Sequence, residues 1–269
     1  PRGMYGEKLG VNMHIMTAAA GAVRNLELCV HRCHLDIEKF VIAPYAAGLA
    51  CLVEDEKILG AICLDMGGGT TTISVFLENQ VMFVSSIPVG GDNVTKDIAR
   101  GLSAPLAYAE RMKNLYGSAI PAASDDQELI RVPLVGEDEN EFSQVPRSML
   151  VGIIRPRLEE TFELVRAELK SAGFSKVGSR RVVLTGGASQ LTGLTNLATN
   201  ILDKQVRVGR PINIKGLAES VNGPAFSACA GLVQLTHNER SEAIIPMARR
   251  IENSGNPFGR LGQWLRENI

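Results

Sequence analysis

The chain has 269 residues, 45% of them apolar, and a formal net charge of −1 at pH 7. This composition can bury a large core, so it excludes a chain that is disordered by default, and the near-neutral charge gives no support to nucleic-acid binding. No run of about 18 apolar residues is present, so we expect no membrane-spanning helix, and the sequence shows no signal-peptide pattern. The odd number of cysteines, each among apolar neighbours, predicts reduced, buried thiols in a cytoplasm rather than disulfides. They are Cys29, Cys33, Cys51, Cys63 and Cys229.

The first 43 residues predict a fragment of a small α/β unit. Residues 11–16 alternate between apolar and polar, as a strand does, and residues 37–43 form a second short strand. Between them, apolar residues recur at helical spacing from Val23 to Cys33. Because the chain opens on Pro1, which begins no recognisable element, we expect it to start partway through a longer protein.

A possible metal set lies in this predicted helix, at Cys29, His31, Cys33 and His34. The two cysteines are four residues apart and therefore share a helix face. Because apolar residues occupy the same face, core packing is favoured over zinc binding.

A helix and a three-stranded meander follow. Pro44 opens an Ala-rich helix that reaches about Val53, since proline is tolerated in a first helical turn. The first turn of the meander consists of three glycines, at 67–69, and residues 78–79 form the second. The predicted strands are residues 61–65, 70–77 and 81–87.

The middle of the chain is predicted to be helical, with one polar insertion. Thr95 and Ser103 are expected to be the N-caps of two helices, the second of which ends at Gly117. Residues 122–147 indicate a hairpin whose many carboxylates are solvated.

One long helix is predicted to follow Ser148 and to end at Gly173. Pro156 lies inside the pattern and should kink the helix or mark its true start. The apolar stripe of this helix consists of Val151, Ile154, Leu158, Phe162, Val165 and Leu169.

The last part of the chain alternates between apolar elements and weaker patterns. Residues 181–185 predict a buried strand that turns into a helix at two glycines, 186–187, and residues 223–235 form a helix of small residues. The pattern then fades into a linker over residues 237–256, and residues 257–269 form a last short helix. The helix after the glycine pair carries Leu191, Leu194 and Leu197.

The strongest chemical signal is the first glycine turn. Asp65 ends a strand, three glycines follow at 67–69, and Thr70 and Thr71 open the returning strand. Three glycines let backbone N–H groups approach an anion closely, and the threonines add hydroxyl donors for phosphate oxygens. Asp65 is placed to hold Mg²⁺ through water. The alternative is a tight hairpin with an incidental aspartate.

A second glycine turn, Gly186-Gly187, joins a buried strand to a helix N-terminus, whose free N–H groups can receive a phosphate or a sugar. Alone, it is better explained as an ordinary turn with Ser189 as N-cap. The two turns lie over one hundred residues apart, with a helical insertion between them. Together they fit a nucleotide held in a cleft.

These motifs resemble those of actin-like ATPases, and the chain as a whole resembles the FtsA family of bacterial cell-division proteins. The superfamily pattern is carried in order by residues 65–71, 87–91, 109–113 and 184–187. The family resemblance is carried by Pro1-Arg2-Gly3-Met4-Tyr5-Gly6, Thr95-Lys96-Asp97-Ile98-Ala99, Ile154-Arg155-Pro156-Arg157 and the C-terminal Trp264-Leu265-Arg266.

The resemblance implies an α/β actin-like ATPase fold that is incomplete at its N-terminus, and an ATP and Mg²⁺ site with at most weak ATPase activity and no catalytic residue. The family's first phosphate loop is missing from this chain. Asp65 to Thr71 would be the second phosphate loop, followed by Gly90-Gly91. Gly186, Gly187 and Ala188 would lie against the adenosine, and Glu110 and Lys113 would flank the ribose and purine.

It also implies an organisation and a set of partners. The implied partners are the FtsZ C-terminal tail, bound by Arg157 or Arg155, other copies of the chain in filaments, other divisome proteins, and membrane lipids bound through the C-terminal helix. The implied location is the cytoplasmic side of the inner membrane, at the division septum. The expected parts are a remnant of a small domain (1–43), a helix of the first lobe (44–57), the nucleotide-binding core of the second lobe (58–93 and 178–222), an inserted FtsZ-binding subdomain (94–177), a helix returning to the first lobe (223–236), a linker (237–256) and a membrane-targeting helix (257–269).

The predicted C-terminal helix is amphipathic and too short to span a bilayer, but long enough to lie in its interface. Five partly buried apolar side chains would bind weakly and reversibly, so stable attachment requires many tails at once. The alternative is a helix that docks on its own domain. The apolar face is Phe258, Leu261, Trp264, Leu265 and Ile269.

The sequence therefore predicts a nucleotide-dependent scaffold and membrane adaptor. Two rivals share the superfold: a pilus-assembly relative and a small-molecule kinase. A kinase would place a catalytic carboxylate beside a substrate pocket, and the sequence offers none. Neither rival accounts for the amphipathic tail.

Overall fold

The computed structural model describes residues 5–11, 13–136, 142–174, 181–212, 214 and 216–237. Contacts divide the chain into two units. One contains Pro1–Met16 and Ala43–Asn238, and the other Thr17–Ile42 and Glu239–Ile269. Each unit is described below by itself.

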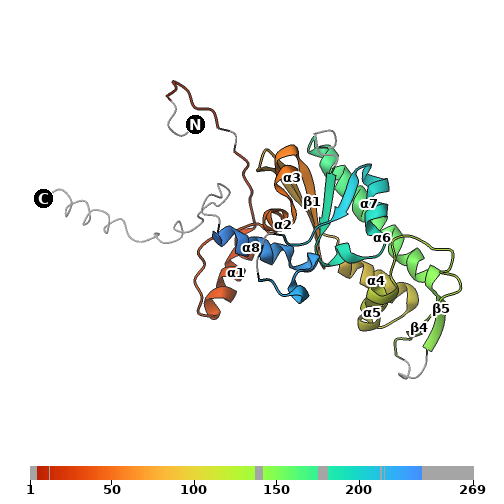
Figure 1. Cartoon of the computed structure of the whole chain (residues 1–269). Helices are drawn as coiled ribbons and strands as arrows, with labels where there is room; N and C mark the ends of the chain where they lie inside the picture. The colour runs from red at the N-terminus through yellow and green to blue at the C-terminus, as the bar shows by residue number, and fades with distance from the viewer. Residues whose placement is uncertain are drawn as a thin grey trace. The chain divides into compact units, whose positions relative to one another are not determined.

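The larger unit is built on a five-stranded mixed sheet with the strand order β3-β2-β1-β6-β7 (Figure 1). The first three strands form the predicted antiparallel meander, and β6 and β7 run parallel to β1. Glu78 and Asn79, both at positive φ, close the β2–β3 hairpin, as a two-residue turn with the twist of its strands requires. The strands are β1 (Ala61–Met66), β2 (Thr71–Leu77), β3 (Gln80–Ile87), β6 (Arg181–Thr185) and β7 (Gln205–Val208).

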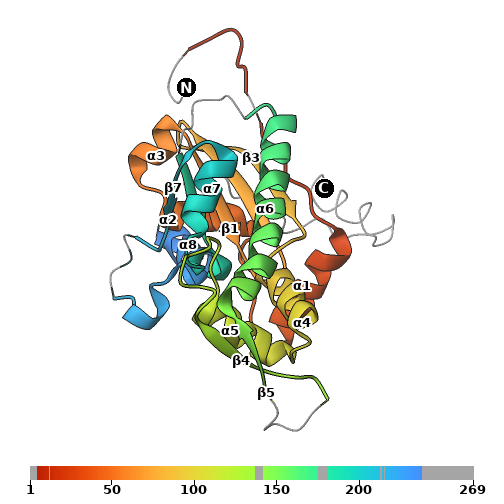
Figure 2. The same ribbon diagram turned by 90° about the vertical axis from the view of Figure 1, so that its right-hand side faces the viewer.

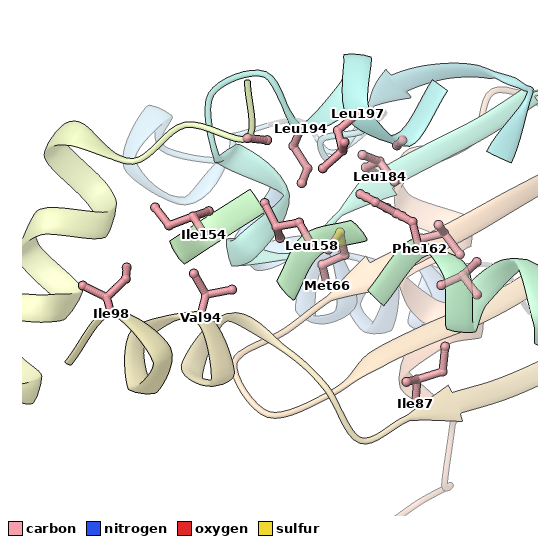
Figure 3. Close-up of a cluster of buried hydrophobic side chains, with 14 of the residues drawn as sticks. Met66, Ile87, Val94, Ile98, Ile154, Leu158, Phe162, Leu184, Leu194 and Leu197 are labelled. Carbon is pink, nitrogen blue, oxygen red and sulfur yellow. The ribbon is translucent and has the colours of Figure 1, made fainter. Parts of the chain in front are cut away.

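Helices cover both faces of this sheet, which is why its central strands are apolar on both sides. Ala61 and Cys63 of β1 belong to a core cluster with α2 and α8, and α3 precedes β1. Ile62 and Leu64 belong to a larger cluster with α4, α5, α6 and α7. Figure 3 shows part of this cluster, including Val94 of α4, Leu158 of α6 and Leu194 of α7. On that face α6 and α7 lie side by side (Figure 2). The helices are α2 (Ala43–Cys51), α3 (Glu54–Leu59), α4 (Gly91–Leu102), α5 (Leu106–Tyr116), α6 (Arg147–Ser171), α7 (Leu194–Leu202) and α8 (Ser227–His237).

The predicted long helix is confirmed as α6, and every residue of its apolar stripe is buried. The helix begins at Arg147 and continues through Pro156, so the proline does not mark its start. Gly173, at φ +80°, follows its end. The polar insertion before it contains the expected hairpin, β4 (Leu129–Pro133) and β5 (Phe142–Pro146).

The prediction of two short strands before residue 44 is wrong. Residues 11 and 13–16 carry no regular structure, and neither do residues 37–42. A strand needs a neighbour for its N–H and C=O groups, and no strand among the described residues pairs with either segment. The alternating Val11, Met13 and Ile15 are all exposed.

The described part of the smaller unit contains the expected helix, α1 (Ala20–Arg32), and none of its residues is buried. Cys29, Cys33 and, on α8, Cys229 are exposed, so the expectation of buried thiols is wrong for these three. It is confirmed for Cys51 and Cys63, where burial raises the pKa of both thiols. Within the described residues no three potential ligand side chains group as a metal site.

Three helix starts differ from the expected ones. Thr95 lies inside α4, which begins at Gly91, and Ser103 is the left-handed C-cap of α4. Residues after the second glycine turn form a 3-10 helix, η1 (Gly187–Gln190), before α7. Two further 3-10 turns, η2 (Glu219–Val221) and η3 (Pro224–Phe226), precede α8. The hydroxyl residues Thr95 and Ser103 indicated N-caps, but α4 begins at the glycine pair 90–91, where the backbone turns into the helix.

Candidate functional site

A cavity of about 530 Å³ lies between the two glycine turns of the larger unit. Its walls come from the β1–β2 turn, the start of α4, α5, the middle of α6 and η1. The predicted nucleotide residues that line it are Gly67, Gly68, Thr71, Gly90, Gly91, Glu110, Lys113, Gly187 and Ala188. The structure therefore brings together in one hollow residues that are over one hundred positions apart in sequence.

The first glycine turn is held from outside by the start of α4. The N–H groups of Gly91 and Asp92 donate to the carbonyls of Gly67 and Gly68, at 2.9 and 2.8 Å. The hydroxyl of Thr71 donates to Val89 O at 2.8 Å. Within the described part of the chain, the N–H groups of Gly68 and Gly69 have no hydrogen-bond partner. The turn thus has fixed carbonyls and unused donors, which is the arrangement that suits an anion.

Gly90 makes this contact possible because it has no side chain. A Cβ at Gly90 would lie 2.3 Å from Gly68 O and 2.7 Å from Gly67 O. A Cβ on the neighbouring Gly91 would lie 3.2 Å from Ala188 Cβ, so the start of α4 also approaches the second glycine turn.

Asp65 lies beneath the two turns rather than in the cavity wall. It pairs with Thr72 on β2 and Thr185 on β6, and its Oδ1 lies 2.4 Å from the position that a Cβ at Gly186 would take. Burial raises the pKa of Asp65 above its ordinary value. Gly69, Thr70 and Gly186 were predicted as site residues and do not line the cavity either.

The second glycine turn is fixed by the segment before α8. Gly186 has φ +85°, and its N–H donates to Pro224 O at 3.1 Å. The buried hydroxyl of Thr185 lies 2.7 Å from Ser227 Oγ. Gly187 and Ala188 then line the cavity. The turn is therefore built as the sequence indicated, except that a 3-10 turn takes the place of the expected helix.

Glu110 and Lys113 of α5 stand in the cavity wall as an ion pair, with Nζ 2.6 Å from Oε2. Thr95 of α4 contacts both, at 2.5 Å from Glu110 Oε2 and 2.8 Å from Lys113 Nζ. Partial burial acts to raise the pKa of Glu110, but hydrogen bonds from Lys113 and Thr95 outweigh it and the pKa lies below its ordinary value. Glu110 is therefore ionised at neutral pH.

Sequence reasoning missed several lining residues. Asp92 and Asn114 each adjoin a predicted residue, Gly91 and Lys113, and that adjacency could have indicated them. Met66 likewise adjoins the predicted Gly67, whereas residues of α6 such as Leu158 and Thr161 reach the cavity only through tertiary packing. The remaining lining residues that were missed are Val94, Gly117, Gln190, Leu191 and Thr192.

The two arginines predicted to bind a partner lie on α6, outside the cavity lining. Arg157 contacts Asp97 of α4 (Nε–Oδ2 2.5 Å) and Glu160 (Nη1–Oε2 2.5 Å), and its hydrogen bond with Asp97 raises its pKa. Arg155 pairs with Glu159 at 2.7 Å. Both guanidinium groups therefore already have carboxylate partners within the chain. The predicted membrane residues, 258–269, lie outside the described residues, and no helix of the described part is long and apolar enough to cross a membrane.

This sheet, with helices on both faces and a cavity between two glycine turns, is the fold of an actin-like ATPase. Over 82% of this chain and 66% of the other, it matches the crystal structure of MreB5 of Spiroplasma citri bound to ADP, at a TM-score of 0.64 and 14% identity. It also matches a MamK double helical filament, at a TM-score of 0.60 and 16% identity, over 82% of this chain and 66% of that one.

The particular family follows from sequence. The family model described as Cell division protein FtsA matches residues 62–231. The cell division protein FtsA of Rhizobium meliloti is 47% identical over 273 residues, which cover 100% of this chain and 62% of that protein. The chain belongs to the FtsA family and spans somewhat less than two thirds of the length of this relative.

Proposed function

We propose that this chain provides the nucleotide-binding lobe of a cell-division scaffold that binds Mg-ATP and links the FtsZ ring to the inner membrane. The observation that carries the proposal is the cavity between the glycine turns, in a chain of the FtsA family. A ligand bound by only one conformation stabilises it by about 2.7 kcal/mol at a hundredfold excess over Kd, so ATP can act as an assembly switch.

In the proposed complex, the phosphates lie against the first glycine turn, where Gly68 and Gly69 offer N–H donors. Gly187 and Ala188 face the adenosine, and the Glu110–Lys113 pair meets the sugar and base. The raised pKa of Asp65 fits a Mg²⁺ ion held through water, since a nearby cation would favour its ionised form. Mg²⁺ would neutralise phosphate charge there.

The first test replaces Gly68 with valine in a form of the protein with the full length of its relatives. A Cβ at Gly68 would lie 3.1 Å from Asp92 Oδ1, and the rest of the side chain would occupy space beside the turn. We expect ATP to bind at least about tenfold more weakly, a loss of about 1.4 kcal/mol, measured by calorimetry. Unchanged affinity in a folded variant would refute the phosphate placement.

The second test concerns the FtsZ tail. We propose that Arg157, or Arg155 as second choice, receives a carboxylate of that peptide, because a guanidinium can bond both oxygens. Arg157→Glu is expected to abolish binding of the FtsZ C-terminal peptide, measured by fluorescence anisotropy, while ATP binding is unchanged.

The Asp97–Arg157 ion pair supplies the control. Asp97→Asn keeps the arginine and removes its charged partner on α4. If Arg157 binds the peptide, Asp97→Asn retains peptide binding. If Arg157 only ties α6 to α4, Asp97→Asn and Arg157→Glu lose binding alike, and the placement is wrong.

The third test concerns the membrane. We propose that residues 257–269 form an interfacial helix, since tryptophan favours that depth and arginines favour anionic headgroups. Trp264→Glu is expected to release the protein from anionic liposomes in a flotation assay without lowering its melting temperature. A lower melting temperature with retained liposome binding would instead make the tail a packing element.

Family membership favours this function over the pilus-assembly rival, and filament formation by self-association remains part of the proposal. A small-molecule kinase would need a catalytic carboxylate in the cavity. Asp92 and Glu110 are the acidic side chains in its lining, and Glu110 is already paired with Lys113. An ATP-dependent transfer to a sugar or acetate in a coupled assay would favour the kinase.

A further inference from the structure

We propose that Thr95, a residue outside the cavity lining, positions the Glu110–Lys113 pair for a nucleotide that carries free ribose hydroxyls. The inference rests on the proposed nucleotide site and deepens it. Thr95 is 7% exposed, lies one helical turn after Gly91 on α4, and contacts both members of the pair on α5.

The direction of each hydrogen bond follows from counting protons. A threonine hydroxyl has one proton and a lysine ammonium has three, whereas an ionised carboxylate only accepts. The Thr95 hydroxyl has two acceptors within reach, Gly91 O at 3.1 Å and Glu110 Oε2 at 2.5 Å. The charged carboxylate at the shorter distance is the stronger acceptor, so Thr95 donates its proton to Glu110 Oε2 and accepts from Lys113 Nζ. The ammonium also donates to Glu110 Oε2 at 2.6 Å and to Gly91 O at 3.2 Å. Thr95, Glu110 and Lys113 thus form a closed triangle anchored on the glycine pair of α4.

This triangle decides what the pair can offer a ligand. The ammonium of Lys113 donates its three protons to Gly91, Thr95 and Glu110. It therefore holds the cavity wall together and has no N–H group free to bind a ligand. Glu110 Oε2 is also occupied. Glu110 Oε1 accepts only from the side chain of Asn114, at 3.2 Å, among the described residues. The wall therefore presents a carboxylate acceptor, which suits a hydroxyl donor such as those of a ribose.

Loss of the Thr95 hydroxyl would remove the donor to Glu110 and the acceptor for Lys113 together. Because both partners are charged and partly buried, each would turn toward other partners or water. The acceptor at Glu110 would then lose its fixed position. Binding of the sugar should suffer, while the glycine turn that receives phosphate keeps its own hydrogen bonds to Gly91 and Asp92.

The test compares Thr95→Val, which removes the hydroxyl, with Thr95→Ser, which retains it, in the protein with the full length of its relatives. Calorimetry measures binding of Mg-ATP, of Mg-2′,3′-dideoxy-ATP and of magnesium tripolyphosphate. We expect Thr95→Val to bind ATP about tenfold more weakly and Thr95→Ser to restore binding to within about threefold. Dideoxy-ATP and tripolyphosphate should bind all three proteins equally.

Three outcomes overturn the inference. In the first, Thr95→Val binds ATP as tightly as the wild type does. In the second, Thr95→Ser fails to restore ATP binding. In the third, Thr95→Val binds dideoxy-ATP or tripolyphosphate more weakly by the same factor as ATP, which would show a merely structural role in α4–α5 packing. If the wild-type protein itself binds no Mg-ATP, the proposed function fails first, and that result is distinct from the other three.

Discussion

Replacing Gly90 with alanine is expected to weaken ATP binding by at least about a hundredfold, or about 2.8 kcal/mol, although Gly90 is not in the phosphate turn itself. Its φ of −151° is extended backbone that alanine adopts without strain, so the effect comes from contact alone. The added Cβ would meet the carbonyl oxygens of Gly68 and Gly67 at 2.3 and 2.7 Å. These are backbone atoms, so the turn must move and its hydrogen bonds from Gly91 and Asp92 must break.

Gly152→Ala on α6 is the control, because it adds the same methyl group outside the phosphate turn and outside the cavity lining. No atom lies within 4 Å of the position that its Cβ would take. We expect the control to bind ATP within about threefold of wild type in the same calorimetric assay. Equal losses in the two variants would mean that contact with the turn is not the cause. A Gly90→Ala protein that is folded and binds ATP normally would place the phosphates elsewhere.

The sheet and the long helix were predictable because short-range patterns specify them. Each strand of the β1–β3 meander is rich in apolar and β-branched residues and is bounded by a turn, and Glu78-Asn79 suits a two-residue hairpin turn. The stripe on α6 repeats at helical spacing from Val151 to Leu169, and it is buried as predicted. Pro156 did not end this helix, because tertiary packing overrides a local penalty.

The failures occur where a local pattern lacked its partner or had a stronger neighbour. Residues 11–16 alternate like a strand, but a strand is stable only beside another. Thr95 has the residue type of an N-cap, yet α4 begins at Gly91, and the Thr95 hydroxyl reaches the α5 pair instead. Sequence periodicity contains no information about which helix will lie across from a side chain.

The site shows the same division. Both glycine turns could be found from sequence, since each is a local motif with a chemical reason. Asp65 was predicted to hold Mg²⁺ through water; it ends β1 beneath the turns and does not line the cavity, so its role stays a prediction. The pairing of Arg157 with Asp97 connects residues that are 60 positions apart, so it could not be read from either segment alone. Contacts between residues so far apart in sequence can be identified only once the fold is known.

Gly231→Ala is expected to destabilise the larger unit by about 2–4 kcal/mol, the largest effect on stability that we predict. On the face of the sheet opposite α6, α8 lies so close to α2 that a Cβ at Gly231 would be 1.8 Å from Ala46 O. Backbone cannot rotate away as a side chain can, so the two helices must separate and the cluster containing Cys51, Cys63 and Ala230 must loosen. In thermal unfolding, the melting temperature should fall by about 2–4 °C for each kcal/mol lost.

The control is Gly152→Ala in α6, where nothing lies within 4 Å of the added Cβ and alanine should stabilise the helix by about 0.5–1 kcal/mol. A Gly231→Ala protein as stable as this control would show that α2 and α8 do not touch through their backbones.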